Sequence, residues 1–224
     1  MFQEGKSQEA VAEYERALAA KPDNAKSLNN LALALVELGR LDEAAGRFKA
    51  SLAVEPKAEI YSDLGFTMAR LGKPDEALAN YRKALELDPD CPSAHANMAV
   101  SFVQAGQLDE AESHYRKALA GKPTAETHNG LGFVLARQNR TEEAIAEFHQ
   151  AIDANPKFAP AYNNLAEALV KQGKLEAAAD AYRRSLAEKP SPGVQQALDA
   201  VLRKIGKTDD ADQLGKAEAT GSVR

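Results

Sequence analysis

Six prolines recur along the chain at steps of 33 or 34 residues, and this spacing constrains the fold more strongly than any other feature. They stand at positions 22, 56, 89, 123, 156 and 190. A glycine recurs with the same step at positions 5, 39, 72, 106, 173 and 206, and Asn139 occupies the one remaining slot. A period of this length indicates a stack of structural repeats, each of which contacts mainly its neighbours.

Each repeat is predicted to contain two helices separated by the glycine. Apolar side chains in the first helix follow steps of three or four residues, as at Leu28, Leu31 and Leu35. The glycine, or Asn139 in its place, supplies the left-handed residue that ends a helix. Acidic residues such as Asp42 open the second helix, where they suit the positive end of the helix dipole. The following proline stops that helix.

Two segments show the recurring residues most fully. Residues 159–190 contain Tyr162, Leu165, Ala166, Leu169, Gly173, Ala178, Tyr182 and Pro190. Residues 58–89 contain Tyr61, Leu64, Gly65, Met68, Gly72, Ala77, Tyr81 and Pro89. This pattern resembles the tetratricopeptide repeat (TPR) family, although the leading tryptophan of that family is absent. The resemblance covers residues 1–191, and more weakly residues 192–219.

The resemblance implies an all-α fold, a right-handed superhelical α-solenoid of stacked antiparallel helix pairs. Complete units are predicted at residues 25–57, 58–91, 92–124, 125–158 and 159–191. Residues 1–24 are expected to supply only the second helix of a partial repeat, so that the chain is a fragment or begins with a half-unit. Residues 192–219 are expected to form a degenerate repeat with capping helices, and residues 220–224 a disordered tail.

Composition and charge exclude several classes of function. The formal net charge is −5, so no basic surface points to nucleic acid as a partner. No apolar run is long enough for membrane insertion, and the first residues lack the pattern of a signal peptide, which favours the cytoplasm. The single cysteine, Cys91, excludes an internal disulfide and a multi-cysteine metal site.

The sequence indicates a protein without catalytic activity, cofactor or metal. His95 and His128 stand at the leading packing position of their first helices, and we interpret both as packing residues. His114 and His149 lack a partner at the spacing of a helical zinc motif. The chain has no glycine-rich phosphate loop after a strand and no serine nucleophile motif.

In the TPR family the first helix of each unit lines a concave groove, and the resemblance therefore implies that this surface binds a peptide or protein segment. The candidate binding residues are Asn30, Leu33, Phe66, Arg70, Asn97, Val100, Phe133, Arg137, Asn164 and Lys171.

The candidates divide by chemistry into three groups. The apolar row, with Phe66 and Phe133 as its anchors, is predicted to contact apolar side chains of the partner, unless neighbouring helices partly bury it. The asparagines are predicted to hold an extended backbone, as the resemblance to the TPR superhelix of O-linked N-acetylglucosamine transferases implies, or else to be simply solvated. Asp63 and Gly130 interrupt that asparagine ladder. Arg70 and Arg137 are predicted to select polar groups of the partner.

Members of the family that bind chaperone tails hold a terminal carboxylate with a lysine at the fifth position of a unit. Here the fifth positions are Asn29, Ser62, Ala96, Asn129 and Asn163. We therefore expect no strong affinity for acidic chaperone C-termini.

Two other functions are compatible with the sequence. The partial first repeat leaves the packing face of residues 10–18, which includes Val11 and Tyr14, open for self-association into a structural assembly. Alternatively, the chain is the targeting arm of a larger enzyme such as a glycosyltransferase. Neither the partner nor its motif follows from the sequence.

Overall fold

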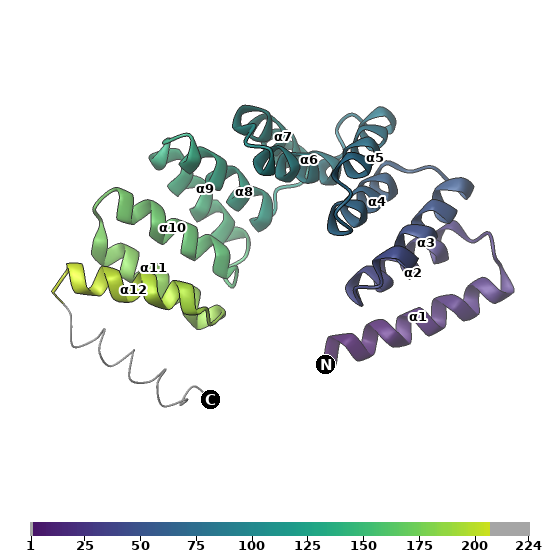
Figure 1. Cartoon of the computed structure of the whole chain (residues 1–224), viewed down its shortest axis with the longest axis horizontal. Helices are drawn as coiled ribbons and strands as arrows, with labels where there is room; N and C mark the ends of the chain where they lie inside the picture. Colours follow the sequence, from purple (N-terminus) through teal and green to yellow (C-terminus); the bar gives the residue numbers. More distant parts are fainter. Residues whose placement is uncertain (1, 207–224) are drawn as a thin grey trace. The chain divides into compact units, whose positions relative to one another are not determined.

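A computed structural model describes residues 2–206, with side chains from residue 5 onward, and in this range the chain is all α-helical (Figure 1). Its helices are α1 (Phe2–Ala20), α2 (Ala25–Glu37), α3 (Leu41–Val54), α4 (Ala58–Arg70), α5 (Pro74–Leu87), α6 (Pro92–Gln104), α7 (Leu108–Gly121), α8 (Ala125–Arg137), α9 (Thr141–Ala154), α10 (Ala159–Lys171), α11 (Leu175–Glu188) and α12 (Pro192–Lys204). The predicted all-α class is confirmed. The end of the weak repeat and the predicted tail, residues 207–224, lie outside the described residues.

The helices form antiparallel pairs, and within each of two units successive pairs stack on one another (Figure 1). The closest pairs are α2 with α3, α4 with α5, α6 with α7, α8 with α9, and α10 with α11. The chain divides into two compact units, residues 1–121 and 122–224, which we call the N-terminal and C-terminal units. In each, first helices of successive pairs also touch: α4 contacts α6 in the N-terminal unit, and α8 contacts α10 in the C-terminal unit.

A left-handed residue ends the first helix of each pair. After α2, Gly39 has φ 73°, its N–H donates to the carbonyl of Val36, and the N–H of Arg40 donates to the carbonyl of Leu35. These two bonds close the helix end. Asn139 adopts the same conformation after α8, with φ 62°, which confirms its predicted equivalence to glycine. Gly5 differs, because it lies inside α1.

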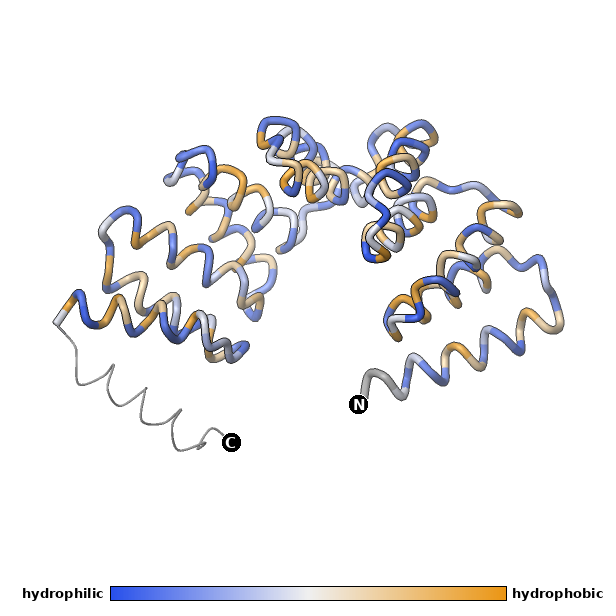
Figure 2. The backbone as a smooth tube through the Cα atoms, in the orientation of Figure 1, coloured by the Kyte–Doolittle hydropathy of each residue, from blue (hydrophilic) through white to orange (hydrophobic). Residues whose placement is uncertain are grey.

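In two of the pairs, α4 with α5 and α8 with α9, an aromatic ring of the second helix packs against a glycine of the first. A Cβ atom added at Gly65 of α4 would lie 2.5 Å from the ring of Tyr81, and one added at Gly132 of α8 would lie 2.6 Å from the ring of Phe148. Both rings are almost fully buried. Hydrophobic and hydrophilic residues alternate along the helices (Figure 2), and in α2 the buried residues Leu28, Leu31 and Leu35 lie three or four positions apart, on one face.

Alanine in place of Gly173 should lower the free energy of unfolding by about 1 kcal/mol, because Gly173 has φ 74° and a Cβ atom strains that conformation. Gly46→Ala is the matched control. Gly46 lies in the middle of α3 with nothing within 4 Å of an added Cβ, so alanine should there raise the free energy of unfolding by about 1 kcal/mol. Denaturant titration measures both. Changes of the same sign would contradict the role assigned to Gly173.

Candidate functional site: pockets on the first helices

The ten predicted site residues lie on the first helices of the pairs and line three pockets. Asn30 and Leu33 line a pocket between α1 and α2. A second pocket between α4 and α6 contains Phe66, Arg70, Asn97 and Val100. A third pocket between α8 and α10 contains Phe133, Arg137, Asn164 and Lys171.

The pocket between α4 and α6 has a volume of about 210 Å³ and is formed by an aromatic wall, an arginine and polar side chains of α6. Phe66 is 42% exposed, and the guanidinium carbon of Arg70 lies 5.9 Å from the centre of its ring. Nη1 of Arg70 also donates to the carbonyl of Val36 at the end of α2. The ring of Tyr81 reaches the pocket from α5, and Val100 lines its opposite side.

The pocket between α8 and α10 has the same construction in the C-terminal unit, with a smaller volume of about 80 Å³. Phe133 is 38% exposed, and the guanidinium carbon of Arg137 lies 5.8 Å from its ring centre. Phe148 of α9 takes the place of Tyr81. Two charged residues of α10, Glu167 and Lys171, line the side where the other pocket has neutral residues.

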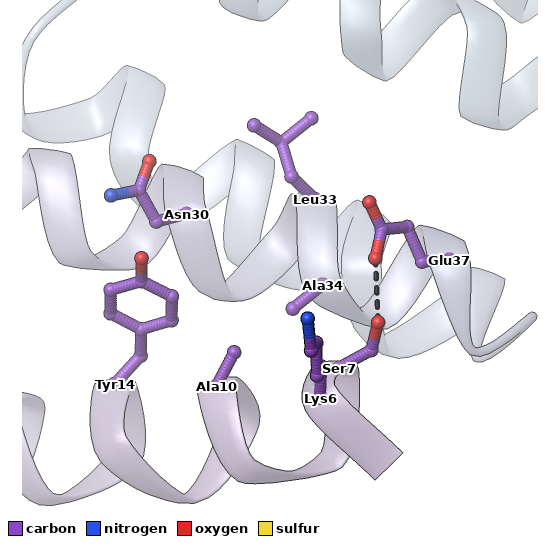
Figure 3. A pocket seen from close by; sticks show the side chains of 8 residues that line it. All are labelled: Lys6, Ser7, Ala10, Tyr14, Asn30, Leu33, Ala34 and Glu37. Atoms are coloured by element: carbon purple, nitrogen blue, oxygen red, sulfur yellow. Dashed lines mark hydrogen bonds between the residues drawn. The ribbon is translucent and has the colours of Figure 1, made fainter. Parts of the chain in front are cut away.

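The pocket between α1 and α2 is the largest of the three, at about 390 Å³ (Figure 3). Tyr14 and Ala10 of α1 point towards α2, and the tyrosine hydroxyl is directed at Asn30 (Figure 3). At the other end, the hydroxyl of Ser7 donates to a carboxylate oxygen of Glu37 over 2.6 Å.

The asparagines of the ladder are partly used inside the protein. Nδ2 of Asn97 donates to the hydroxyl of Ser62 over 3.1 Å, and Nδ2 of Asn164 donates to Oδ1 of Asn129 over 2.8 Å. In each case the sixth position of one repeat binds the fifth position of the repeat before it. The sequence predicted these amides as donors to a ligand backbone, whereas in the structure they connect successive first helices.

Asp63 occupies the same sixth position in α4 and has a different electrostatic environment. Burial raises the pKa of its carboxyl group to about 6, and Glu59, one turn earlier, shifts the pKa in the same direction. The equivalent fifth-position residue of the preceding repeat is Asn29, whose Oδ1 atom is buried and has no hydrogen-bond partner. An amide at position 63 would supply the kind of donor found at the other two sites.

Two side-chain pairs, His95 with His114 and His128 with Glu147, occupy equivalent positions of successive repeats. His95, which is only 2% exposed, lies with Nδ1 2.9 Å from Nδ1 of His114 and with Nε2 2.9 Å from the carbonyl of Pro89. Because a carbonyl only accepts, Nε2 of His95 carries a hydrogen, and in the neutral form of this ring Nδ1 accepts from Nδ1 of His114. Burial, with a smaller contribution from His95, lowers the pKa of His114. The predicted packing role of His95 is confirmed.

His128 lies with Nδ1 2.7 Å from a carboxylate oxygen of Glu147, the residue equivalent to His114. Cys91 is fully buried at the start of α6. In the part of the chain that the structure describes, no three His, Cys, Asp or Glu side chains gather as metal ligands would. The described helices also include none that is both long and apolar enough to cross a membrane.

Several lining residues were missed by the sequence analysis. The pocket between α4 and α6 also contains Ala69, Tyr81 and Ser101. The repeat pattern assigns Tyr81 to the core, and its ring serves both the core and the pocket. Alternate repeats are 67 residues apart in the sequence. Adding 67 to the number of each lining residue of this pocket gives a residue that lines the pocket between α8 and α10.

Comparison with known families agrees with this architecture. Sequence profiles of the tetratricopeptide repeat match residues 23–90, 56–124 and 130–191, and a further TPR repeat profile matches residues 1–39. The chain belongs to the tetratricopeptide repeat family. Its sequence matches none of the curated proteins compared with it.

Solved structures share the fold at low sequence identity. A chain of the APC/C hetero-tetramer Cut9–Hcn1 aligns with a TM-score of 0.81 and 20% identity, over 94% of this chain and 42% of that chain. PilW, a widely conserved type IV pilus biogenesis factor, aligns with a TM-score of 0.77 and 19% identity, over 89% of this chain and 94% of PilW. The pilF protein of Pseudomonas aeruginosa aligns with a TM-score of 0.76 and 16% identity, over 97% and 95%.

Asp63→Asn should stabilise the chain at neutral pH. The pKa of Asp63 is about 6 in the folded chain and 3.8 for an ordinary aspartate, so folding disfavours its ionised form. Between about pH 6 and about pH 4, Asp63 is more protonated in the folded chain than in the unfolded chain. Lowering the pH through this range therefore raises the contribution of Asp63 to the free energy of unfolding. The substitution should therefore raise the free energy of unfolding by about 1–2 kcal/mol near pH 7.5 and by less near pH 4.

Denaturant titrations at the two pH values measure this difference. Asp90→Asn, at an exposed loop position between α5 and α6, controls for the loss of one negative charge and should change stability little at either pH. A gain for Asp63→Asn of the same size at both pH values would show that ionisation of Asp63 is not its cause.

Proposed function

We propose that the chain is a non-catalytic protein-interaction scaffold that binds a peptide or protein segment along the exposed faces of its first helices. The observation that carries this proposal is the distribution of exposed apolar side chains. Within the described residues the exposed large apolar side chains are Leu33, Val54, Phe66, Leu87, Val100 and Phe133. Four of these six lie on first helices, and each of the four lines a pocket.

Exposure of these side chains is costly for the free protein. The part of a phenylalanine or valine side chain that stays in water forgoes the free energy that its burial would provide. A row of such residues at equivalent repeat positions is typical of an interaction surface. The arginine beside each phenylalanine, and the polar side chains of α6 and α10, supply hydrogen-bonding groups around the apolar row. Membership of the TPR family also supports a scaffold role.

The double variant Phe66→Ala/Phe133→Ala tests the site. Peptides selected from a random library on the intact chain should bind the variant at least about tenfold more weakly, because each substitution removes an apolar anchor from a pocket. Val54→Ala/Leu87→Ala is the matched control, since those residues are equally exposed but line none of the three pockets. Calorimetry measures affinity, and circular dichroism should show unchanged helix content. Unchanged affinity in the pocket variant would reject the binding site.

We infer self-association as a second candidate, favoured by the size of the pocket between α1 and α2 and by the apolar residues in its lining. A helix from a second copy would contact Ala10, Tyr14 and Leu33 there. Leu33→Glu should then reduce the mass measured by light scattering at high protein concentration, because a buried carboxylate opposes association. A chain that is already monomeric at high concentration would contradict this candidate and leave peptide binding intact.

A further inference from the structure

We propose that each of the two units carries one copy of the same binding site, specific for a short segment in which an apolar side chain lies next to an acidic one. The sites are the pocket between α4 and α6 and the pocket between α8 and α10. This inference rests on the proposed function, and it adds the number of sites and the chemistry of the segment.

The two pockets correspond residue by residue. Every one of the eight residues that line the first has its counterpart 67 positions later in the lining of the second. The pairs are Phe66 and Phe133, Ala69 and Ala136, Arg70 and Arg137, Tyr81 and Phe148, Asn97 and Asn164, Val100 and Glu167, Ser101 and Ala168, and Gln104 and Lys171. Linings whose positions all correspond indicate the same site repeated. The residues differ mainly on the side formed by α6 or α10, and Tyr81 is replaced by Phe148 on the second helix.

The shared part of the lining defines an apolar cavity. An exposed phenylalanine forms one wall, an alanine one turn further along the same helix leaves space beside it, and an aromatic ring from the second helix reaches the cavity. None of these groups requires a polar partner from a ligand, apart from the hydroxyl of Tyr81. The volumes are about 210 Å³ in the N-terminal unit and about 80 Å³ in the C-terminal unit.

The arginines make the rim of each cavity cationic. Arg70 and Arg137 form no ion pair with any described residue, and the position four residues earlier, where an acidic partner would lie, is occupied by the phenylalanine. Arg140, by contrast, pairs with Glu143 over 2.6 Å. A guanidinium stacked on a ring keeps its N–H edge free to bind a carboxylate. Arg70 uses one of its N–H groups on the carbonyl of Val36.

The charges around the cavities favour an acidic segment. In the pocket between α4 and α6, Arg70 is the one cationic residue of the lining, and that lining contains no Asp or Glu. The C-terminal pocket has two cations, Arg137 and Lys171, and one anion, Glu167, whose carboxylate accepts a hydrogen bond from Asn163. Both pockets are therefore net positive on a chain whose formal net charge is −5. An acidic side chain gains from this local contrast, whereas a basic one would meet a like charge.

The intact chain can be titrated with three matched peptides, each acetylated and amidated so that no terminal charge takes part: Gly-Ser-Leu-Asp-Ser-Gly, the same peptide with Asn for Asp, and the same peptide with Ser for Leu. NMR spectra of the side-chain amides of Asn97 and Asn164 report the two pockets separately. The Leu-Asp peptide should shift both amides and bind about fivefold to tenfold more tightly than either matched peptide.

Charge variants assign each site. Arg70→Gln should weaken binding at Asn97 and leave binding at Asn164 unchanged, and Arg137→Gln should do the reverse. Arg116→Gln, which removes a cation on α7 outside the three pockets, is the control and should leave both signals as in the parent chain. Equal binding of the Leu-Asn peptide, loss at both amides from one arginine variant, or no shift at either amide would each overturn the proposal.

The same measurements separate this proposal from the broader one. If library-selected peptides lose affinity for Phe66→Ala/Phe133→Ala but contain no acidic residue, the first helices bind peptides and the acidic specificity is wrong. If selected peptides bind the double variant and the parent chain equally, the site itself is wrong.

Discussion

The packing of one aromatic ring against one small residue is the constraint on which this structure depends. The rings of Tyr81 and Phe148 lie so close to Gly65 and Gly132 that a methyl group at either glycine would overlap with them. Because protein interiors are close-packed, this contact sets how closely the two helices of a pair approach. The same rings reach the pockets between successive first helices. Helix spacing and the shape of the candidate sites are therefore determined by one contact.

Polar contacts between first helices add a second constraint on the same surface. Asn97 and Asn164 bind residues of the preceding repeat and also line the pockets. A side chain that joins two helices in this way is held in one orientation before any ligand arrives, and such preorganisation reduces the entropy lost on binding. Asp63, at the equivalent position, is the exception. Its raised pKa indicates that burial of a carboxylate is poorly compensated there.

The sequence predicted the repeat architecture because the residues that determine it act locally. A left-handed residue after a helix, such as Gly39 or Asn139, has one structural consequence wherever it occurs. All ten predicted site residues were found from their position within the repeat, and all lie on first helices. What the sequence could not reveal depends on contacts between repeats. The hydrogen bond from Asn97 to Ser62 joins residues 35 positions apart, and its partner is visible only once the two helices are placed together.

The contrast between the two linings shows how a repeat protein can keep a site and change its preference. The wall contributed by α4 or α8 is tied to packing, since the phenylalanine follows directly after the glycine that accepts the aromatic ring. The side contributed by α6 or α10 is free of that contact, and there Val100, Ser101 and Gln104 correspond to Glu167, Ala168 and Lys171. Residues that serve both fold and site are thus the same in kind, whereas Val100 and Gln104 are replaced by the charged residues Glu167 and Lys171. Variation of this type changes which segment a unit selects and leaves the stacking of its helices intact, because all four of these side chains are exposed.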